Sequence, residues 1–158
     1  MVSASKELTG LGVRHALVGG LAVGAHGFAR ATKDVDFIVD DSAWRQTEGG
    51  LLVMTAGLPF RAHGVAIDTL PVGEDERFLT RAIADAESTE GIPVAPVEAL
   101  VYMKLSSPRA KDRADVIELV KSGIDVAKVA HYLDVNAPAL TQAFSEAVQV
   151  ARSEEDES

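Results

Sequence analysis

The sequence predicts an α/β protein (α+β in the order of its elements), with a small mixed β-sheet, flanking helices and a helical C-terminal part. Up to about residue 95, short apolar runs of strand length alternate with helix-prone segments. Beyond that point, apolar residues recur at helical spacing between residues that start and stop helices. The chain has 158 residues, of which 47% are hydrophobic and 25% charged, so it can bury one sizeable core.

Glycine, serine and aspartate residues mark the ends of the elements in the first part. Ser3 or Ser5 can cap the first helix, and Asp40 begins a capping cluster for a later one. A tight turn at His63-Gly64 would join two strands into a hairpin. The predicted elements are a helix over 3–11, a strand over 15–18, a helix over 20–27, a strand over 34–39, a helix over 42–54, a hairpin of strands 58–62 and 65–70, a short helix over 76–84 and an edge strand over 92–94.

Four helices are predicted after residue 95. Pro96 suits the first turn of one helix, and Ser107-Pro108 suits the start of the next. Gly123 is a natural stop, and Asp125 is a natural cap for the helix that follows it. The predicted spans are 96–105, 108–121, 126–133 and a last helix that opens at Asn136 and Pro138.

The chain is expected to form one compact unit. Residues 1–95 would be its core, 96–152 would be helices packed on that core, and 153–158 would be an acidic tail. The run of acids from Glu154 to Glu157 predicts a disordered, solvated tail. The net charge of −9, from 24 acids against 15 bases, disfavours a broad nucleic-acid surface.

Several classes of protein are excluded or disfavoured by composition. The absence of cysteine excludes disulfides, thiol catalysis and thiolate metal sites. The four histidines lack metal-ligand spacing, so structural or surface roles are expected for them. No run reaches the roughly 18 apolar residues of a membrane span, and the N-terminus lacks a signal-peptide core. We therefore expect a cytoplasmic protein without a membrane partner.

The stretch from Val18 to Phe37 combines two features that point to chemistry. Gly19-Gly20 ends a short strand where a helix begins, which lets backbone approach a ligand closely. Asp34 and Asp36 stand two apart on a predicted strand, so their side chains should share one face. Together they fit Mg²⁺ bound to a nucleoside triphosphate, although each alone also fits a plain turn and a solvated strand face.

The same residues resemble a known signature. Gly19-Gly20, a spacer of thirteen residues that contains Arg30 and Thr32, and Asp34-Val35-Asp36 look like the motif of the DNA polymerase β-like nucleotidyltransferase superfamily. Among its members, the chain most resembles the small bacterial abortive-infection (AbiEii-type, type IV toxin) nucleotidyltransferases. The resemblance covers roughly residues 14 to 120 and implies that 1–95 is a nucleotidyltransferase catalytic core.

Asp68 is the third carboxylate of interest. It interrupts the apolar run 65–70, where a buried aspartate is costly unless it is paired or binds a metal. From the residues alone, an exposed strand end before Pro71 explains it equally well. The resemblance implies the metal role, because the third carboxylate of that superfamily lies on a later strand beside the Asp-x-Asp strand.

A basic segment follows in the helical part. Lys104, Arg109, Lys111 and Arg113 fall within ten residues of an acidic chain. They fit a solvated helix face paired with Asp112 and Asp115. The run also resembles the downstream element of the same small nucleotidyltransferases, which implies that the basic residues face the active-site cleft. We expect Lys104 to face either solvent or that cleft, with the cleft favoured.

The resemblance implies a Mg²⁺-dependent transfer of a nucleoside monophosphate from a triphosphate to a hydroxyl acceptor. Two Mg²⁺ ions would be held by Asp34, Asp36 and Asp68, and the nucleotide would be bound by Gly19, Gly20, Arg30, Thr32, Lys104 and Lys111. RNA, a protein and a small molecule all remain open as acceptor, and so does a toxin–antitoxin role with an antitoxin partner. The alternatives are an inactive nucleotide-binding regulatory or antitoxin-like module, and a metal-dependent phosphohydrolase.

Overall fold

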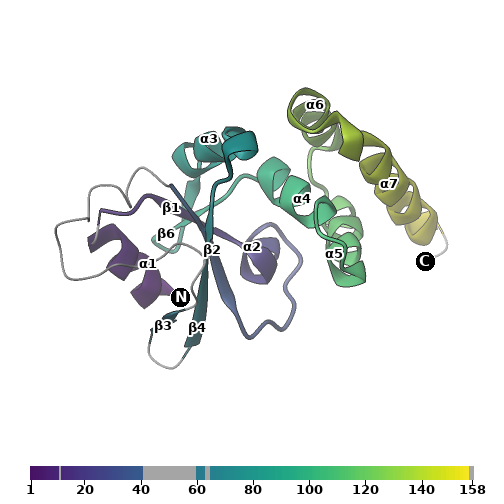
Figure 1. The fold of residues 1–158 in the computed structure, drawn as a ribbon. Helices are drawn as coiled ribbons and strands as arrows, with labels where there is room; N and C mark the ends of the chain where they lie inside the picture. Colours follow the sequence, from purple (N-terminus) through teal and green to yellow (C-terminus); the bar gives the residue numbers. More distant parts are fainter. Residues whose placement is uncertain (11, 41–59, 63–64, 157–158) are drawn as a thin grey trace. The chain divides into compact units, whose positions relative to one another are not determined.

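The computed structural model describes residues 1–10, 12–40, 60–62 and 65–156 (Figure 1). Their order is mixed α and β in the first part and purely helical after residue 96, as the sequence predicts. The elements are α1 (Val2–Gly10), β1 (His15–Val18), α2 (Gly19–Ala25), β2 (Val35–Val39), β3 (Phe60–Ala62), β4 (Val65–Pro71), η2 (Glu74–Glu76), α3 (Phe78–Ala84), β5 (Glu87–Thr89), β6 (Ile92–Val94), α4 (Val97–Leu105), α5 (Ala110–Lys121), α6 (Val126–Asn136), η3 (Pro138–Leu140) and α7 (Thr141–Asp156).

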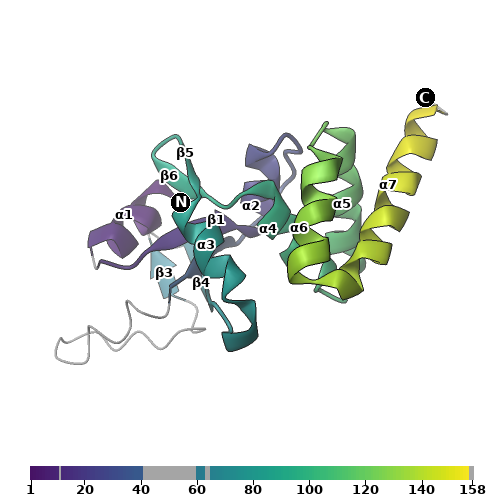
Figure 2. The same ribbon diagram turned by 90° about the horizontal axis from the view of Figure 1, so that it is seen from above.

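The strands form one six-stranded mixed sheet in the order β3-β4-β2-β1-β6-β5. Its centre is β2, which runs antiparallel to β1 and parallel to β4. Strand β6 runs parallel to β1, while β3 and β5 pair antiparallel with their neighbours at the two edges. The mixed sheet with flanking helices that we expected is therefore confirmed, and Figures 1 and 2 show it from two directions.

One face of the sheet is tied to α1 through a buried histidine. His15 Nδ1 donates to the Val13 carbonyl at 2.9 Å, and His15 Nε2 lies 2.7 Å from the Ser5 hydroxyl of α1. The His15 ring also meets Phe37 of β2 edge to face, with 5.2 Å between ring centres. Burial lowers the pKa of His15, although the hydrogen bond to Val13 acts in the opposite direction. His15 thus serves the core, in line with the structural role expected for the histidines.

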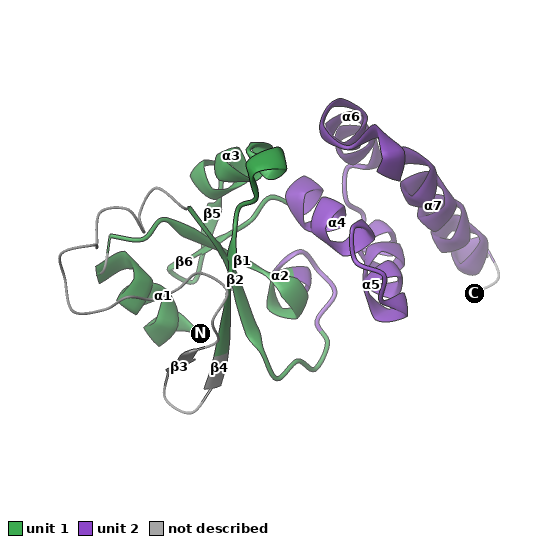
Figure 3. Cartoon of the chain, in the orientation of Figure 1, with its two compact units in different colours: residues 1–22, 30–96 green, residues 23–29, 97–158 purple. Residues whose placement is uncertain are grey.

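The chain folds into two compact units instead of the single unit that we expected (Figure 3). Unit 1 comprises Met1–Ala22 and Arg30–Pro96, and it contains the whole sheet. Unit 2 comprises Val23–Ala29 and Val97–Ser158. The passage from unit 1 to unit 2 after Pro96 lies next to the boundary predicted at residue 95, whereas nothing in the sequence indicates that residues 23–29 join the helical unit. The Ser122 hydroxyl, which donates to the His26 carbonyl at 3.2 Å, fastens that segment to the end of α5.

Unit 2 is built from helices whose apolar faces meet. Helix α4 packs against α5 and α6, and α7 packs against α5 and α6. Asp125 caps α6 by accepting from the Lys128 backbone N–H at 2.9 Å, as expected. Gly123 follows α5 with a φ of +88°, a conformation that glycine adopts without strain. The buried apolar residues include Leu100, Val101, Val116, Leu119, Val129, Leu133, Phe144, Val148 and Ala151.

The acidic tail was expected to be disordered from residue 153, but it is helical as far as Asp156. Helix α7 runs from Thr141 to Asp156 without a break. It is anchored by a buried apolar stripe that includes Phe144 and Ala151, and its Glu154 pairs with Lys121 of α5. A regular apolar face and an ion pair to a neighbouring helix together hold the acidic end in helical form.

Strand β6 is not an edge strand, because β5, which the sequence did not predict, pairs beyond it. The helix predicted over 42–54 and the turn at His63-Gly64 lie outside the described residues. Asp40, the expected cap of that helix, is buried and accepts from Arg14 Nε at 3.1 Å.

Within the described part of the chain, no helix combines the length and the apolar character needed to cross a bilayer.

Candidate active site

The register of three neighbouring strands brings two of the predicted carboxylates together. Val18 at the end of β1 pairs with Asp36 of β2, and Asp36 pairs with Asp68 of β4. Residues paired directly across a sheet lie on the same face, with about 4.8 Å between their strands. Asp36 and Asp68 therefore stand side by side, and both are partly exposed to solvent.

The first glycine of the turn lies against one of these carboxylates. Because Val18 pairs with Asp36, the residue after Val18 leaves β1 beside the Asp36 side chain. A Cβ atom on Gly19 would overlap the Asp36 carboxylate and would lie 2.8 Å from its Cγ. Gly19 also has a φ of +68°, which side chains other than glycine rarely adopt. The turn is thus built for close approach of backbone to Asp36.

The second glycine is covered by the loop that leads into β2. A Cβ atom on Gly20 would lie 3.1 Å from Arg30 Nη2 and 3.2 Å from both Arg30 Cζ and Thr32 Cβ. Arg30 Nη1 donates to the Ala31 carbonyl at 3.4 Å, and the Thr32 hydroxyl donates to the Asp34 carbonyl at 3.4 Å. The structure therefore gathers Gly19, Gly20, Arg30 and Thr32 around the turn that follows β1.

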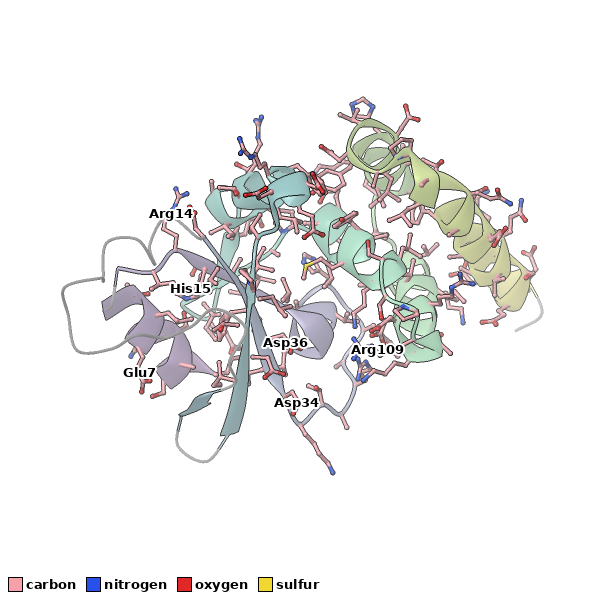
Figure 4. All side chains as sticks on the ribbon, viewed as in Figure 1. Glu7, Arg14, His15, Asp34, Asp36 and Arg109 are labelled. Atoms are coloured by element: carbon pink, nitrogen blue, oxygen red, sulfur yellow. The ribbon has the colours of Figure 1, made fainter. Side chains whose placement is uncertain are left out.

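Asp34 occupies a different position from the one that we predicted for it. It lies one residue before β2, so it is not part of the strand, and it is exposed (Figure 4). Among the residues that the structure describes, no three or more His, Asp or Glu side chains are grouped closely enough to hold a metal ion. The oxygen donors of Asp36 and Asp68 suit Mg²⁺ chemically, and they supply two carboxylates of the expected three. The strand register thus brings together two of the three predicted carboxylates, and the third stands at the entrance of β2.

Replacing Gly19 with alanine is expected to destabilise unit 1. The alanine would have to hold a left-handed φ, which costs about 1–2 kcal/mol, and its methyl group would displace the Asp36 carboxylate. Urea denaturation of both proteins should show a loss of this size or larger.

The same helix supplies a matched control. Gly24→Ala would place its Cβ 3.7 Å from the Ala29 Cα, an ordinary contact, so it should be neutral or stabilise by up to about 1 kcal/mol. Equal stability of the Gly19→Ala protein and the parent would show that the turn relaxes without cost.

Lys104 lies at the centre of a buried ion-pair cluster in unit 2. Its Nζ is 2.6 Å from Asp112 Oδ1 and 2.7 Å from Asp115 Oδ2, and all three side chains are at most 7% exposed. Asp112 also accepts from the Ser107 hydroxyl and from Arg109 Nε, each at 2.6 Å. Burial raises the pKa of Asp112, but the hydrogen bonds from Lys104, Ser107 and Arg109 outweigh it and lower that pKa to about 2.

The expectation that Lys104 faces solvent or a cleft is wrong. The side chain of Lys104 is only 7% exposed and is satisfied by two carboxylates one helix away. The ion pairs with Asp112 and Asp115 that composition suggested do form for Lys104, but they are buried instead of solvated. Lys111 and Arg113 are exposed on α5.

Ser107 and Arg109 were not identified from the sequence as partners of Asp112. Ser107 and Arg109 both donate to Asp112, and Arg109 is the residue before α5. The sequence does indicate that Asp112 is buried, because it lies four residues before Val116 and seven before Leu119, on the apolar face of α5. A carboxylate on a buried helix face requires donors, and the flanking loop is where they are found.

The sequence matches no protein-family model, and no curated protein matches it. A solved structure with some similarity is that of an antigenic nucleotidyltransferase-like protein from Paracoccidioides brasiliensis. The two chains are 16% identical with a TM-score of 0.45, over 91% of this chain and 89% of that chain. A likeness of this size says nothing about the activity or substrate of this chain.

Proposed function

We propose that this chain is a Mg²⁺-dependent nucleotidyltransferase that moves a nucleoside monophosphate from a triphosphate to a hydroxyl acceptor. The observation that supports the proposal most is the pairing of Asp36 with Asp68 across β2 and β4, next to a turn whose Gly19 lies against the Asp36 carboxylate. The sequence motif adds to it, because the two glycines, Arg30, Thr32 and the Asp-x-Asp pair resemble the signature of the polymerase β-like superfamily. A cytoplasmic setting is part of the proposal.

The carboxylates would hold the metal. Asp36 and Asp68 would be its ligands on the two strands, and Asp34 would join them from the entrance of β2. Bound Mg²⁺ would neutralise charge on the triphosphate and make the acceptor hydroxyl more acidic.

The turn and its covering loop would bind the nucleotide. Gly19 and Gly20 lack side chains that would keep phosphate oxygens away from their backbone. Arg30 and Thr32, which lie against Gly20, would contribute a charge and a hydroxyl to the same region. That Lys111 contacts the phosphates or the acceptor stays a prediction from the sequence, and we assign the buried Lys104 to holding α5 in place.

The reaction would be an in-line displacement at the α-phosphorus. The acceptor oxygen forms a bond to that phosphorus, the bond to the oxygen bridging the α- and β-phosphates breaks, and pyrophosphate leaves with the electron pair. Asp68 would take the proton of the acceptor hydroxyl. The main task of the protein side chains is to position the partners and to offset developing charge on the phosphate oxygens.

The proposal can be tested with labelled triphosphates. The chain is incubated with each of the four α-³²P nucleoside triphosphates, Mg²⁺ and cell extract, beside identical reactions with γ-³²P label or with EDTA. The expected result is label transfer to an acceptor from the α position only, with loss of transfer in EDTA. The acceptor is then identified as RNA, protein or small molecule by nuclease, protease and thin-layer chromatography.

Other outcomes would point to the competing functions. Saturable triphosphate binding without turnover would indicate an inactive nucleotide-binding regulatory or antitoxin-like module. Free nucleoside monophosphate in the absence of any acceptor would indicate a phosphohydrolase. Transfer from the γ position would contradict nucleotidyl transfer, because that label leaves with pyrophosphate. Growth arrest on expression, relieved by a neighbouring gene product, would extend the proposal to a toxin with an antitoxin partner.

A further inference from the structure

A buried polar contact joins helix α1 to the sheet of unit 1. His15 Nε2 lies 2.7 Å from Ser5 Oγ, and His15 Nδ1 lies 2.9 Å from the carbonyl oxygen of Val13. His15 is 5% exposed and Ser5 is 3% exposed, and the nearby α1 residues Ala4 and Leu8 are fully buried. The imidazole ring is therefore held in an apolar layer with a partner at each nitrogen. We call this arrangement the Ser5–His15 contact.

The partners and the burial together determine how many protons the ring carries. The Val13 carbonyl can only accept a hydrogen bond, so Nδ1 of His15 carries a proton. Burial disfavours a second, charging proton, and it lowers the pKa of His15 by more than the hydrogen bond to Val13 raises it. Nε2 is then an acceptor, and the Ser5 hydroxyl donates to it. The contact is thus made by a neutral imidazole with its proton on Nδ1.

A second proton on the ring would change this contact in two ways. It would bind to Nε2, which would become a donor, so that the Ser5 hydroxyl would have to turn and accept. It would also bury a positive charge in the layer that His15 shares with Phe37, whose ring centre is 5.2 Å away. An aromatic ring attracts a cation less strongly than a carboxylate does. The charged form is therefore poorly accommodated.

The surrounding elements supply no acidic partner for the ring among the residues that the structure describes. Strand β6, which pairs with β1, has no titratable side chain. The charged groups on the other elements around His15 are exposed, pair with one another or project from the opposite face of the sheet. They are Lys6 and Glu7 of α1, Arg14 and Asp40 at the strand ends, Asp36 of β2 and Arg81 of α3 (Figure 4).

We propose that the Ser5–His15 contact is a pH-sensitive device that holds α1 on the sheet while the imidazole is neutral and loosens α1 when the ring takes up a proton. The inference does not depend on the proposed function. It concerns the back of the candidate site, because Phe37, which the ring touches, follows Asp36 on β2 and projects from the other face of that strand.

The direction of the pH effect follows from where the ring binds its proton more tightly. Opening of α1 brings the ring into water, where its pKa has the ordinary value of 6.5. The pKa is lower in the closed form, so the open form binds the proton more tightly and proton uptake favours opening. The contact therefore stabilises the closed form above about pH 6.5 and weakens as the pH falls below that value.

Native-state hydrogen exchange of the full-length chain tests the inference. Protection factors of the α1 amides are measured by NMR at about pH 7.5 and about pH 5.5, with the intrinsic exchange rates divided out. In the parent they should fall by at least about threefold between the two conditions. In His15→Gln they should stay constant, because the glutamine amide can donate and accept hydrogen bonds but takes up no proton.

His131→Gln is the matched control, because it makes the same substitution at an exposed position of α6 in unit 2. It should keep the parental pH dependence of α1. An equal loss of α1 protection in His15→Gln and in the parent would overturn the inference. If His15→Gln does not fold, the ¹⁵N shifts of the His15 ring in the parent decide. Titration below 6.5 with loss of α1 protection supports the inference, whereas titration at or above 6.5, or protection that stays constant while the ring titrates, overturns it.

Discussion

Asp36→Asn is expected to reduce Mg²⁺-dependent turnover of triphosphate by at least about a hundredfold. The variant keeps the shape of the side chain beside Gly19 but removes the charge that the proposed metal site shares with Asp68. The free energy of unfolding without metal, measured for both proteins, separates loss of the proposed metal site from loss of stability.

The measurement pairs steady-state turnover with thermal unfolding in the presence and absence of Mg²⁺. The parent should gain stability from Mg²⁺, and the Asp36→Asn protein should gain none. Asp85→Asn is a suitable control, because Asp85 is exposed and its only partner in the described structure is Arg81 at the surface. Parental turnover in Asp36→Asn would remove Asp36 from the metal site.

Asp112→Asn is expected to lower the free energy of unfolding by about 3–5 kcal/mol. Asp112 is fully buried, and asparagine offers one acceptor oxygen where the carboxylate has two. Either Lys104 or the pair formed by Ser107 and Arg109 would therefore lose its acceptor and face an amide N–H donor, and Lys104 would keep Asp115 as its one charged partner in this cluster. Denaturant unfolding measures the change, and Asp134→Asn, an exposed position on α6, is the control. A loss below about 1 kcal/mol would show that the cluster relaxes around a neutral side chain.

The same carboxylate predicts how stability depends on acid. The pKa of Asp112 is about 2 in the folded chain against 3.8 as its ordinary value, so the folded state favours the charged form. Its contribution is complete above about pH 4 and disappears as the pH falls toward 2. The parent should therefore lose stability over this range more steeply than Asp112→Asn. Lys104→Met combined with Asp112→Asn should cost less than the sum of the single changes, because both remove the same pair.

The fold was largely predictable because its signals are local. An apolar run that ends at Gly19 predicted β1, and the run between Asp34 and Asp40 predicted β2. Residues such as Asp125 and Gly123 predicted the helix ends of unit 2. The pairing of β6 with β1 and of β5 with β6 was not predictable, because β5 consists of three exposed residues without a hydrophobic pattern. Strands of that kind form because a partner strand is present.

The candidate site was predictable to a similar degree. The two glycines and the Asp-x-Asp pair identified the turn and β2, and the register then placed Asp68 beside Asp36. The position of Lys104 was not predictable by considering α4 alone, since its partners lie eight and eleven residues further along the chain. A lysine in an apolar helix has three options, solvent, a cleft or a buried counter-ion, and only tertiary structure selects among them.

The assignment of residues 23–29 to unit 2 has a consequence for how the chain is made. The polypeptide passes from unit 1 to unit 2 and back before residue 31, and it returns to unit 2 only after residue 96. Unit 2 therefore cannot be completed from its C-terminal sequence alone, since the hydrogen bond between Ser122 and His26 joins residues 96 positions apart. A shortened chain that begins at residue 97 would lack one of its own packing segments, and a chain that stops at residue 96 would leave residues 23–29 without their surroundings. On the ribosome, the segment that follows the glycine turn must wait until the chain has been made at least as far as Ser122 before this hydrogen bond can form.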